Sequence, residues 1–198
     1  IVKESQRLTH QVENVLHFSR ALRGEMRLSP RELHLAPLVQ EVLETFCPLA
    51  EAQDCKVEGF LDESLWGEVD PAAVRQILLN LLENAVKYGP PDQIVDVKLM
   101  KGRPGTVHLR VEDEGEGVPA GERENVCHPY SRLDRHRDSG IAGSGIGLAV
   151  VRELAQRQGG TAWVEEALSG GARFVVELAG FARGPGKPPS ALRPKEDP

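Results

Sequence analysis

The 198-residue sequence has only three cysteines, no long apolar run and no excess of positive charge. Cys47, Cys55 and Cys127 lack the spacing of a metal site, and an odd number of thiols predicts no disulfide and a reducing, cytoplasmic compartment. No signal peptide is recognisable, and no apolar run approaches the roughly 18 residues that span a bilayer. We therefore expect no membrane insertion by this chain, although a longer parent would be free to carry an anchor upstream. A net charge of −6 argues against nucleic acid as a partner.

The length of 198 residues suits one domain with additional terminal segments, and a hydrophobic content of 40% is enough for an ordinary core. Hydrophobic periodicity predicts helices at about 37–53, 71–88 and 146–158. It predicts strands near 55–61, 93–101, 106–113, 161–166 and 173–178. Residues 181–198 are rich in proline, glycine and charge, and are expected to form a flexible tail.

The helix at 71–88 is marked most clearly, because Asp70 can cap it and Pro71 suits its first position. An apolar stripe recurs at spacings of three and four, and is predicted to be buried: Val74, Ile77, Leu78, Leu81, Ala85 and Tyr88.

A second, polar stripe on this helix contains Asn80, Asn84 and Lys87, which helical periodicity places at the border of the core. Amide oxygens supplemented by nucleotide phosphates are suitable ligands for Mg²⁺, and the lysine can balance phosphate charge. A solvated polar helix face is the alternative interpretation of these three residues taken alone.

The segment D-E-G-E-G (113–117) follows an alternating strand, so Asp113 is predicted at the end of a half-buried strand. A carboxylate there can accept a hydrogen bond from an exocyclic amine. Gly115 and Gly117 permit the close ligand approach that suits a purine edge. An ordinary glycine-rich turn is the alternative.

The segment G-S-G-I-G-L (143–148) opens the helix predicted at 146–158, whose free N–H groups suit a phosphate. A glycine cluster before a helix is weak evidence, and this one matches neither a P-loop nor a dinucleotide fingerprint. The order of this segment after N-L-L-E-N-A-V-K-Y (80–88), D-E-G-E-G (113–117) and H-P-Y-S-R (128–132) is the stronger signal.

In this order the four segments resemble the N, G1, F and G2 boxes of the catalytic, ATP-binding part of sensor histidine kinases, over about residues 1–180. The resemblance implies an α+β fold, a two-layer α/β sandwich of the Bergerat (GHKL) type with a mixed sheet behind three helices. It implies a catalytic domain at 37–180 with a lid at about 119–142, a linker at 24–36 and the flexible tail at 181–198.

The N-terminal helix at 1–23 carries Leu8, Val12, Val15 and Leu22 at the spacing of a coiled-coil or bundle seam. It resembles the second helix of the family's dimerisation and phosphotransfer hairpin. An ordinary amphipathic cap helix is the alternative.

The resemblance also implies the cofactors ATP and Mg²⁺ and a role for each matching residue. Carried over by position, these are Asn84 as the metal ligand with Asn80 assisting, Lys87 and Arg132 at phosphate, Tyr88 near the adenine, Asp113 on its amine, Gly115 and Gly117 around the adenine, and Gly143, Gly145, Gly147 and Leu148 at the phosphates and the lid hinge.

Three positions are informative departures: Asn80 differs from structurally related ATPase families, and Cys127 and His128 differ from the usual F box. The chaperone, topoisomerase and mismatch-repair ATPases have a water-activating glutamate where this chain has Asn80, and asparagine is no general base. The chain is therefore expected to hold ATP without fast hydrolysis. In the F box, Cys127 and His128 replace an aromatic and an acidic residue, which puts the packing of the lid in question; an exposed His128 without consequence is the alternative.

The family's phosphoacceptor lies in a His-Glu or His-Asp context, which none of the six histidines has. We therefore expect a fragment of a histidine kinase that passes the γ-phosphate of ATP to a histidine on a hairpin absent from this chain, for relay to a response-regulator receiver domain. The full-length protein is expected to be a homodimer. The alternatives are a non-catalytic ATP-binding sensor with a degenerate lid and, less favoured, a GHKL-type ATPase.

Overall fold

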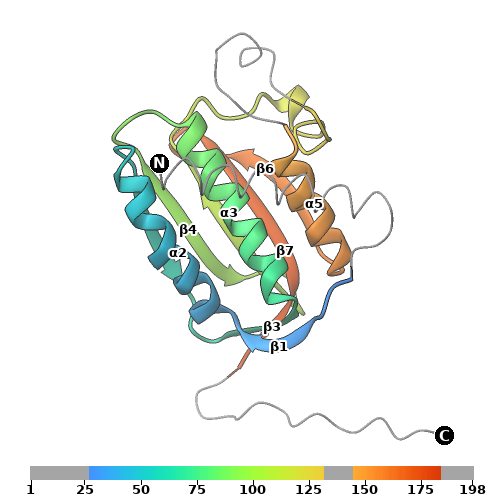
Figure 1. The fold of residues 1–198 in the computed structure, drawn as a ribbon. Coiled ribbons are helices and arrows are strands. Elements are labelled where there is room, and N and C mark those ends of the chain that lie inside the picture. The colour runs from blue at the N-terminus through green and yellow to red at the C-terminus, as the bar shows by residue number, and fades with distance from the viewer. Residues whose placement is uncertain (1–26, 132–144, 184–198) are drawn as a thin grey trace, which may run out of the picture.

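The structure is a computed structural model that describes residues 27–131 and 145–183 (Figure 1). The helix predicted at 1–23, Arg132, Gly143 and residues 184–198 lie outside these ranges. The described helices are α2 (Leu35–Glu51), α3 (Pro71–Tyr88), α5 (Gly147–Arg157) and the 3₁₀ helix η1 (Ala120–Glu122). The strands are β1 (Arg31–His34), β2 (Lys56–Leu61), β3 (Leu65–Val69), β4 (Ile94–Lys101), β5 (Thr106–Glu112), β6 (Thr161–Glu166) and β7 (Ala172–Ala182).

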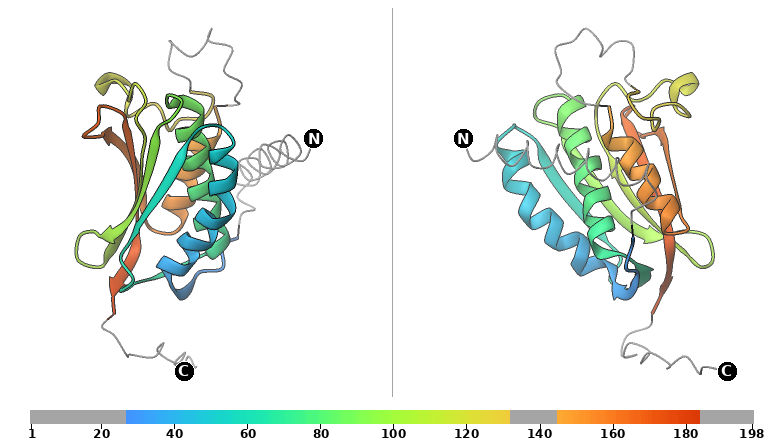
Figure 2. Two further views of the ribbon diagram at one scale, coloured as in Figure 1. Left: turned by 90° about the vertical axis from the view of Figure 1, so that its left-hand side faces the viewer. Right: turned by 45° about the vertical axis from the view of Figure 1, so that its right-hand side comes forward.

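The strands form one mixed sheet in the order β1-β3-β7-β5-β4-β2, and β6 also pairs with β7. β2 and β4 are parallel, whereas the other neighbouring strands are antiparallel. The helices α2, α3 and α5 lie side by side on one face of the sheet (Figures 1 and 2). The predicted two-layer α/β sandwich with a mixed sheet behind three helices is confirmed.

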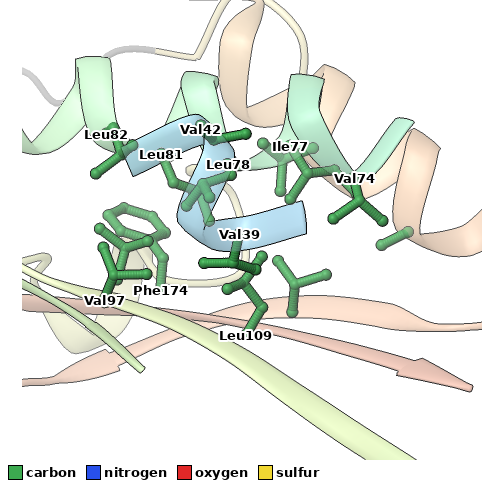
Figure 3. Close-up of a cluster of buried hydrophobic side chains, with 14 of the residues drawn as sticks. Val39, Val42, Val74, Ile77, Leu78, Leu81, Leu82, Val97, Leu109 and Phe174 are labelled. Atoms are coloured by element: carbon green, nitrogen blue, oxygen red, sulfur yellow. The ribbon is translucent and has the colours of Figure 1, made fainter. Parts of the chain in front are cut away.

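The core lies between the helices and the sheet, where apolar side chains of α3 meet those of the strands (Figure 3). Ile77, Leu78 and Leu81 are fully buried, and they face strand residues that include Val97 and Leu109. Truncating one such leucine to alanine typically costs about 2–5 kcal/mol. The predicted apolar stripe of α3 is buried except at Tyr88, which is half-buried.

The helix α3 has the predicted bounds, and its N-terminus is capped as expected. Asp70 Oδ1 accepts hydrogen bonds from the N–H groups of Ala72 at 2.8 Å and Ala73 at 3.1 Å. Its Oδ2 accepts a further hydrogen bond from the N–H of Ser29 at 2.7 Å. Asp70 therefore fixes both the start of α3 and the chain that enters β1.

The structure differs from the sequence analysis at the edge formed by β1 and β3, neither of which was predicted. β1 lies within the range assigned to a linker and pairs with β3. Alternation in β3 is hidden because its central inward position is Gly67, where a Cβ atom would lie 2.9 Å from the carbonyl oxygen of Ala179. Pairing with β3 also extends β7 to Ala182, so the first residues assigned to the tail belong to the sheet.

The face of the sheet away from the helices carries a charged cluster around Glu177 of β7. Its carboxylate accepts hydrogen bonds from Arg103 at 2.6 Å and Thr106 at 3.2 Å, and lies 3.0 Å from His108 Nε2. The hydrogen bonds from Arg103 and His108 lower the pKa of Glu177 to about 2.

Within the described residues, no helix is both long and apolar enough to cross a membrane.

The depressed pKa predicts how stability depends on acid. Glu177 contributes stability that is present above pH 4.5, its ordinary pKa, and is lost as the pH falls toward 2. We expect Glu177→Gln to lower the free energy of unfolding at pH 7 by about 1–2 kcal/mol, a modest figure because Arg103 is largely exposed. Urea denaturation of both proteins at several pH values checks this. A difference that stays constant down to pH 2 would contradict it.

Candidate functional site

The C-terminal half of α3 brings the predicted polar stripe together on one face. Asn80 is buried, with 4% of its surface exposed, while Asn84 and Lys87 are half-buried. Residues 27–131 and 145–183 offer the Asn84 side chain no hydrogen-bond partner. A half-buried amide oxygen without a protein donor is suited to a cation or a water shell.

The start of α5 lies directly against this stripe. A Cβ atom on Gly147 would lie 3.3 Å from Asn80 Oδ1, so glycine allows the two helices to approach closely here. Ile146 caps α5 and supplies no side-chain hydrogen bond to its first turn. Leu148 follows in that turn and is half-buried. The structure thus brings the first and the last of the four sequence segments together.

Asp113 follows the last residue of β5, as predicted, and is 4% exposed. Its Oδ1 accepts hydrogen bonds from the N–H groups of Gly115 and Ala172, each at 3.0 Å. Among the described residues, no donor reaches Oδ2. Burial raises the pKa of Asp113, and the two backbone hydrogen bonds oppose that shift. One carboxylate oxygen is therefore fixed, and the other is left as an acceptor.

The loop after Asp113 packs against the end of α3. A Cβ atom on Gly115 would lie 2.8 Å from the carbonyl oxygen of Tyr88 and 3.1 Å from Asp113 Oδ1. Gly117 has φ +66°, and a Cβ atom there would lie 2.9 Å from the carbonyl oxygen of Gly170. Gly115 therefore permits close approach between the segments that carry Tyr88 and Asp113, and Gly117 permits close approach to the loop at Gly170.

Lys87 and Tyr88 contact each other at the end of α3. Lys87 Nζ donates a hydrogen bond to Tyr88 Oη at 2.7 Å and lies 4.4 Å from the centre of the ring. The ammonium group is thus held beside the aromatic ring that the family resemblance implies near an adenine. Its predicted contact with phosphate remains a prediction.

A backbone hydrogen bond joins the F-box segment (128–132) to the G2 segment (143–148). The N–H of Tyr130 donates to the carbonyl oxygen of Gly145 at 2.9 Å. Gly145 has φ +68°, and a Cβ atom there would lie 3.1 Å from Tyr130 Cα, so both its conformation and its surroundings favour glycine. Tyr130 itself has φ +62° and is 69% exposed. The other residues predicted in these segments, Arg132 and Gly143, lie outside the described ranges.

The two unusual F-box residues have different environments. Cys127 is buried in the hydrophobic core cluster, and burial raises the pKa of its thiol against an opposing effect of Arg152. His128 is exposed. The cysteine is therefore accommodated as a small apolar side chain, and the histidine occupies the exposed position that the sequence analysis weighed as an alternative.

Sequence analysis missed Gln93, a buried amide between α3 and β4 that is 1% exposed. It contacts both the last turn of α3 and the loop after Asp113. Gln93 begins the predicted strand at 93–101 and lies in phase with the buried positions Val95 and Val97, but alternation alone does not indicate what a polar residue at such a position contacts.

Sensor kinases are among the known proteins that this chain resembles in sequence and fold. The model of the histidine kinase-, DNA gyrase B- and HSP90-like ATPase family matches residues 69–180, which is more than half of the chain. Adaptive-response sensory kinase SasA of Synechococcus sp. (strain JA-3-3Ab) is 31% identical over 177 residues, which cover 89% of this chain and 46% of that protein. Sensor histidine kinase TmoS of Ectopseudomonas mendocina is 29% identical over 178 residues, which cover 90% of this chain and 18% of that protein.

Two solved structures give the same result in three dimensions. Full-length ShkA in complex with AMPPNP superimposes with a TM-score of 0.74 and 28% identity, covering 89% of this chain and 37% of ShkA. The mycobacterial sensor histidine kinase MprB gives a TM-score of 0.67 and 26% identity, covering 78% of this chain and all of that structure. This chain spans less than half the length of SasA and TmoS. It belongs to the histidine kinase-, DNA gyrase B- and HSP90-like ATPase family, and within it to the ATP-binding catalytic domains of sensor histidine kinases.

Proposed function

We propose that this domain binds ATP with Mg²⁺ and transfers the γ-phosphate to a histidine on a helical hairpin absent from this chain, for relay to a response-regulator receiver domain. The observation that carries the proposal is the arrangement of Asp113. One oxygen of this buried carboxylate is held by two backbone N–H groups, while the other meets no donor among the described residues. An acceptor of this kind beside Tyr88 and Gly115 suits the exocyclic amine of adenine.

The residues on α3 fit a magnesium ion that arrives with the nucleotide. Asn84 offers an amide oxygen with no protein donor in the described ranges, and Asn80 lies one helical turn before it. Mg²⁺ prefers hard oxygen ligands and keeps phosphate oxygens and waters in its shell, so a site with few protein ligands is typical. When bound, the ion would neutralise charge on the phosphates. Lys87 and Arg132 would add positive charge near them.

Position 80 favours a kinase over a hydrolase. Asn80 is buried against the start of α5, and its neutral amide cannot accept the proton of an attacking water. The domain would therefore position ATP and leave the γ-phosphate intact until another nucleophile arrives. A base for the acceptor histidine would come from the hairpin.

Phosphotransfer to a supplied hairpin tests the proposal. We expect γ-labelled ATP and Mg²⁺ to label a separately prepared dimerisation and phosphotransfer hairpin of a sensor histidine kinase when this chain is added. A hairpin with the acceptor histidine changed to glutamine is the control and should remain unlabelled. Without a hairpin, release of phosphate should be slow.

The alternatives give different results in the same assay. A sensor with an altered F box would bind ATP but label no hairpin and release no phosphate. An ATPase would release phosphate steadily without any hairpin, and Asn84→Ala would abolish that release. Either result would contradict the kinase proposal.

A further inference from the structure

Gln93 lies between α3 and β4 and links two segments of the candidate nucleotide site. Its Nε2 donates to the carbonyl oxygen of Ala85, in the last turn of α3, at 2.9 Å. Its Oε1 accepts from the N–H of Glu114, the residue after Asp113, at 3.3 Å. Gln93 is 1% exposed; its hydrogen bond to Ala85 is buried, and the one from Glu114 is partly buried. The amide therefore ties the end of α3 to the loop that follows β5.

The neighbouring glycine makes room for this amide. Gly89 has φ −83° and ψ 165°, a conformation open to any residue, so its backbone does not require glycine. A Cβ atom on Gly89 would nevertheless lie 2.0 Å from Gln93 Nε2. On the loop side, a Cβ atom on Gly115 would lie 3.5 Å from Gly89 Cα. The two segments thus approach through glycines with the Gln93 amide packed against one of them.

We propose that Gln93 is a positioning residue for the adenine end of the nucleotide. It fixes the separation between Tyr88, which follows Ala85 on α3, and Asp113, which precedes Glu114. This inference rests on the proposed function, because it assigns the spacing of these two residues to adenine recognition. Loss of the link would let the two segments separate and weaken contacts with the base.

Gln158 provides a matched control at the opposite end of α3. Its Oε1 accepts from the N–H of Asp70 at 2.8 Å, and its Nε2 donates to the carbonyl oxygen of Leu154 at 3.2 Å. Gln158→Leu therefore removes one accepted and one donated hydrogen bond, as Gln93→Leu does, but at the N-cap of α3 and at Leu154 of α5. The site residues of α3 lie at the other end, so only Gln93→Leu should affect the nucleotide.

The test compares the affinities of the two variants for ADP and AMP by calorimetry, at a temperature where circular dichroism shows both to be folded. We expect Gln93→Leu to weaken both ligands by about tenfold or more and Gln158→Leu to change them by less than about twofold. Equal losses for ADP and AMP would place the effect at the nucleoside. Unchanged affinity in Gln93→Leu, or an equal loss in Gln158→Leu, would overturn the inference.

Gly89→Ala provides a second route that keeps Gln93 intact. The added methyl group would displace the amide, so we expect a loss of affinity similar to that of Gln93→Leu. In Gly89→Ala/Gln93→Ala the clash is gone, and this double variant should bind ADP no more weakly than Gln93→Ala alone; additive losses would contradict the link. If the parent chain itself bound no ADP, the proposed function would fail, whereas normal binding in both single variants would overturn only the role of Gln93.

Discussion

Asp113→Asn should weaken ATP and ADP binding by about a hundredfold or more, which corresponds to about 2.7 kcal/mol. In the parent, Asp113 Oδ1 is occupied by the N–H groups of Gly115 and Ala172. An asparagine would keep its oxygen on those two donors and place an NH₂ group where Oδ2 stands. Two donors would then face each other when an adenine amine arrives, and a buried amine without its acceptor is costly.

The same substitution should leave the unliganded fold as stable as the parent or slightly more stable. Burial raises the pKa of Asp113, so the folded state disfavours its ionised form. For a carboxyl group with a raised pKa, ionisation at neutral pH costs folding free energy, and a neutral amide removes that cost. Loss of binding without loss of stability would separate recognition from folding.

Calorimetric titration with ADP, together with thermal denaturation of the unliganded proteins, checks both parts. Asp96→Asn is a suitable control, because Asp96 lies on the neighbouring strand β4 and pairs with Lys98 at 3.0 Å on the face away from the helices. It should leave ADP affinity unchanged. An Asp113→Asn variant that kept ADP affinity within about threefold of the parent would contradict the assignment of Asp113 to the base.

Asn84→Ala is expected to remove the effect of Mg²⁺ on ATP affinity. The affinity without metal should stay within about twofold of the parent, because Asn84 is assigned to the ion and not to the base. With Mg²⁺ present, the variant should bind ATP no more tightly than without it, since a lost oxygen ligand weakens a site that demands complete coordination. AMP should bind the variant and the parent equally.

ATP titrations at several Mg²⁺ concentrations measure this coupling directly. Gln40→Ala serves as the control, because it removes an exposed amide of α2 that, among the described residues, donates to Glu44 at 3.1 Å. It should retain the full metal dependence. If Asn84→Ala kept the parent's Mg²⁺ dependence, another residue would have to hold the ion.

The helices and strands with clear local sequence signals were predicted well. The pair Asp70 and Pro71 marked the start of α3, and alternating valines and leucines marked β4 and β5. β3 was missed because Gly67 interrupts its inward-facing positions, although a side chain there would collide with β7. Local patterns thus failed where a strand was specified by its neighbours.

The site could be predicted where the chemistry of a residue and its place at the end of a strand or on a helix face are evident from the neighbouring sequence. Asp113 lies at the end of β5 and is buried, as its sequence context indicated. The proximity of Asn80 to Gly147 depends on the packing of two helices distant in sequence, so only the family resemblance anticipated it. Gln93 was missed because its role depends on contacts with Ala85 and Glu114 that arise only in the folded chain.

One titration tests the central claim most directly: ATP into the parent chain by calorimetry, with and without Mg²⁺. The account predicts saturable binding to one site, tighter in the presence of the metal. Absence of saturable binding under both conditions would contradict it, because neither the acceptor Asp113 nor the amide of Asn84 would then serve a nucleotide.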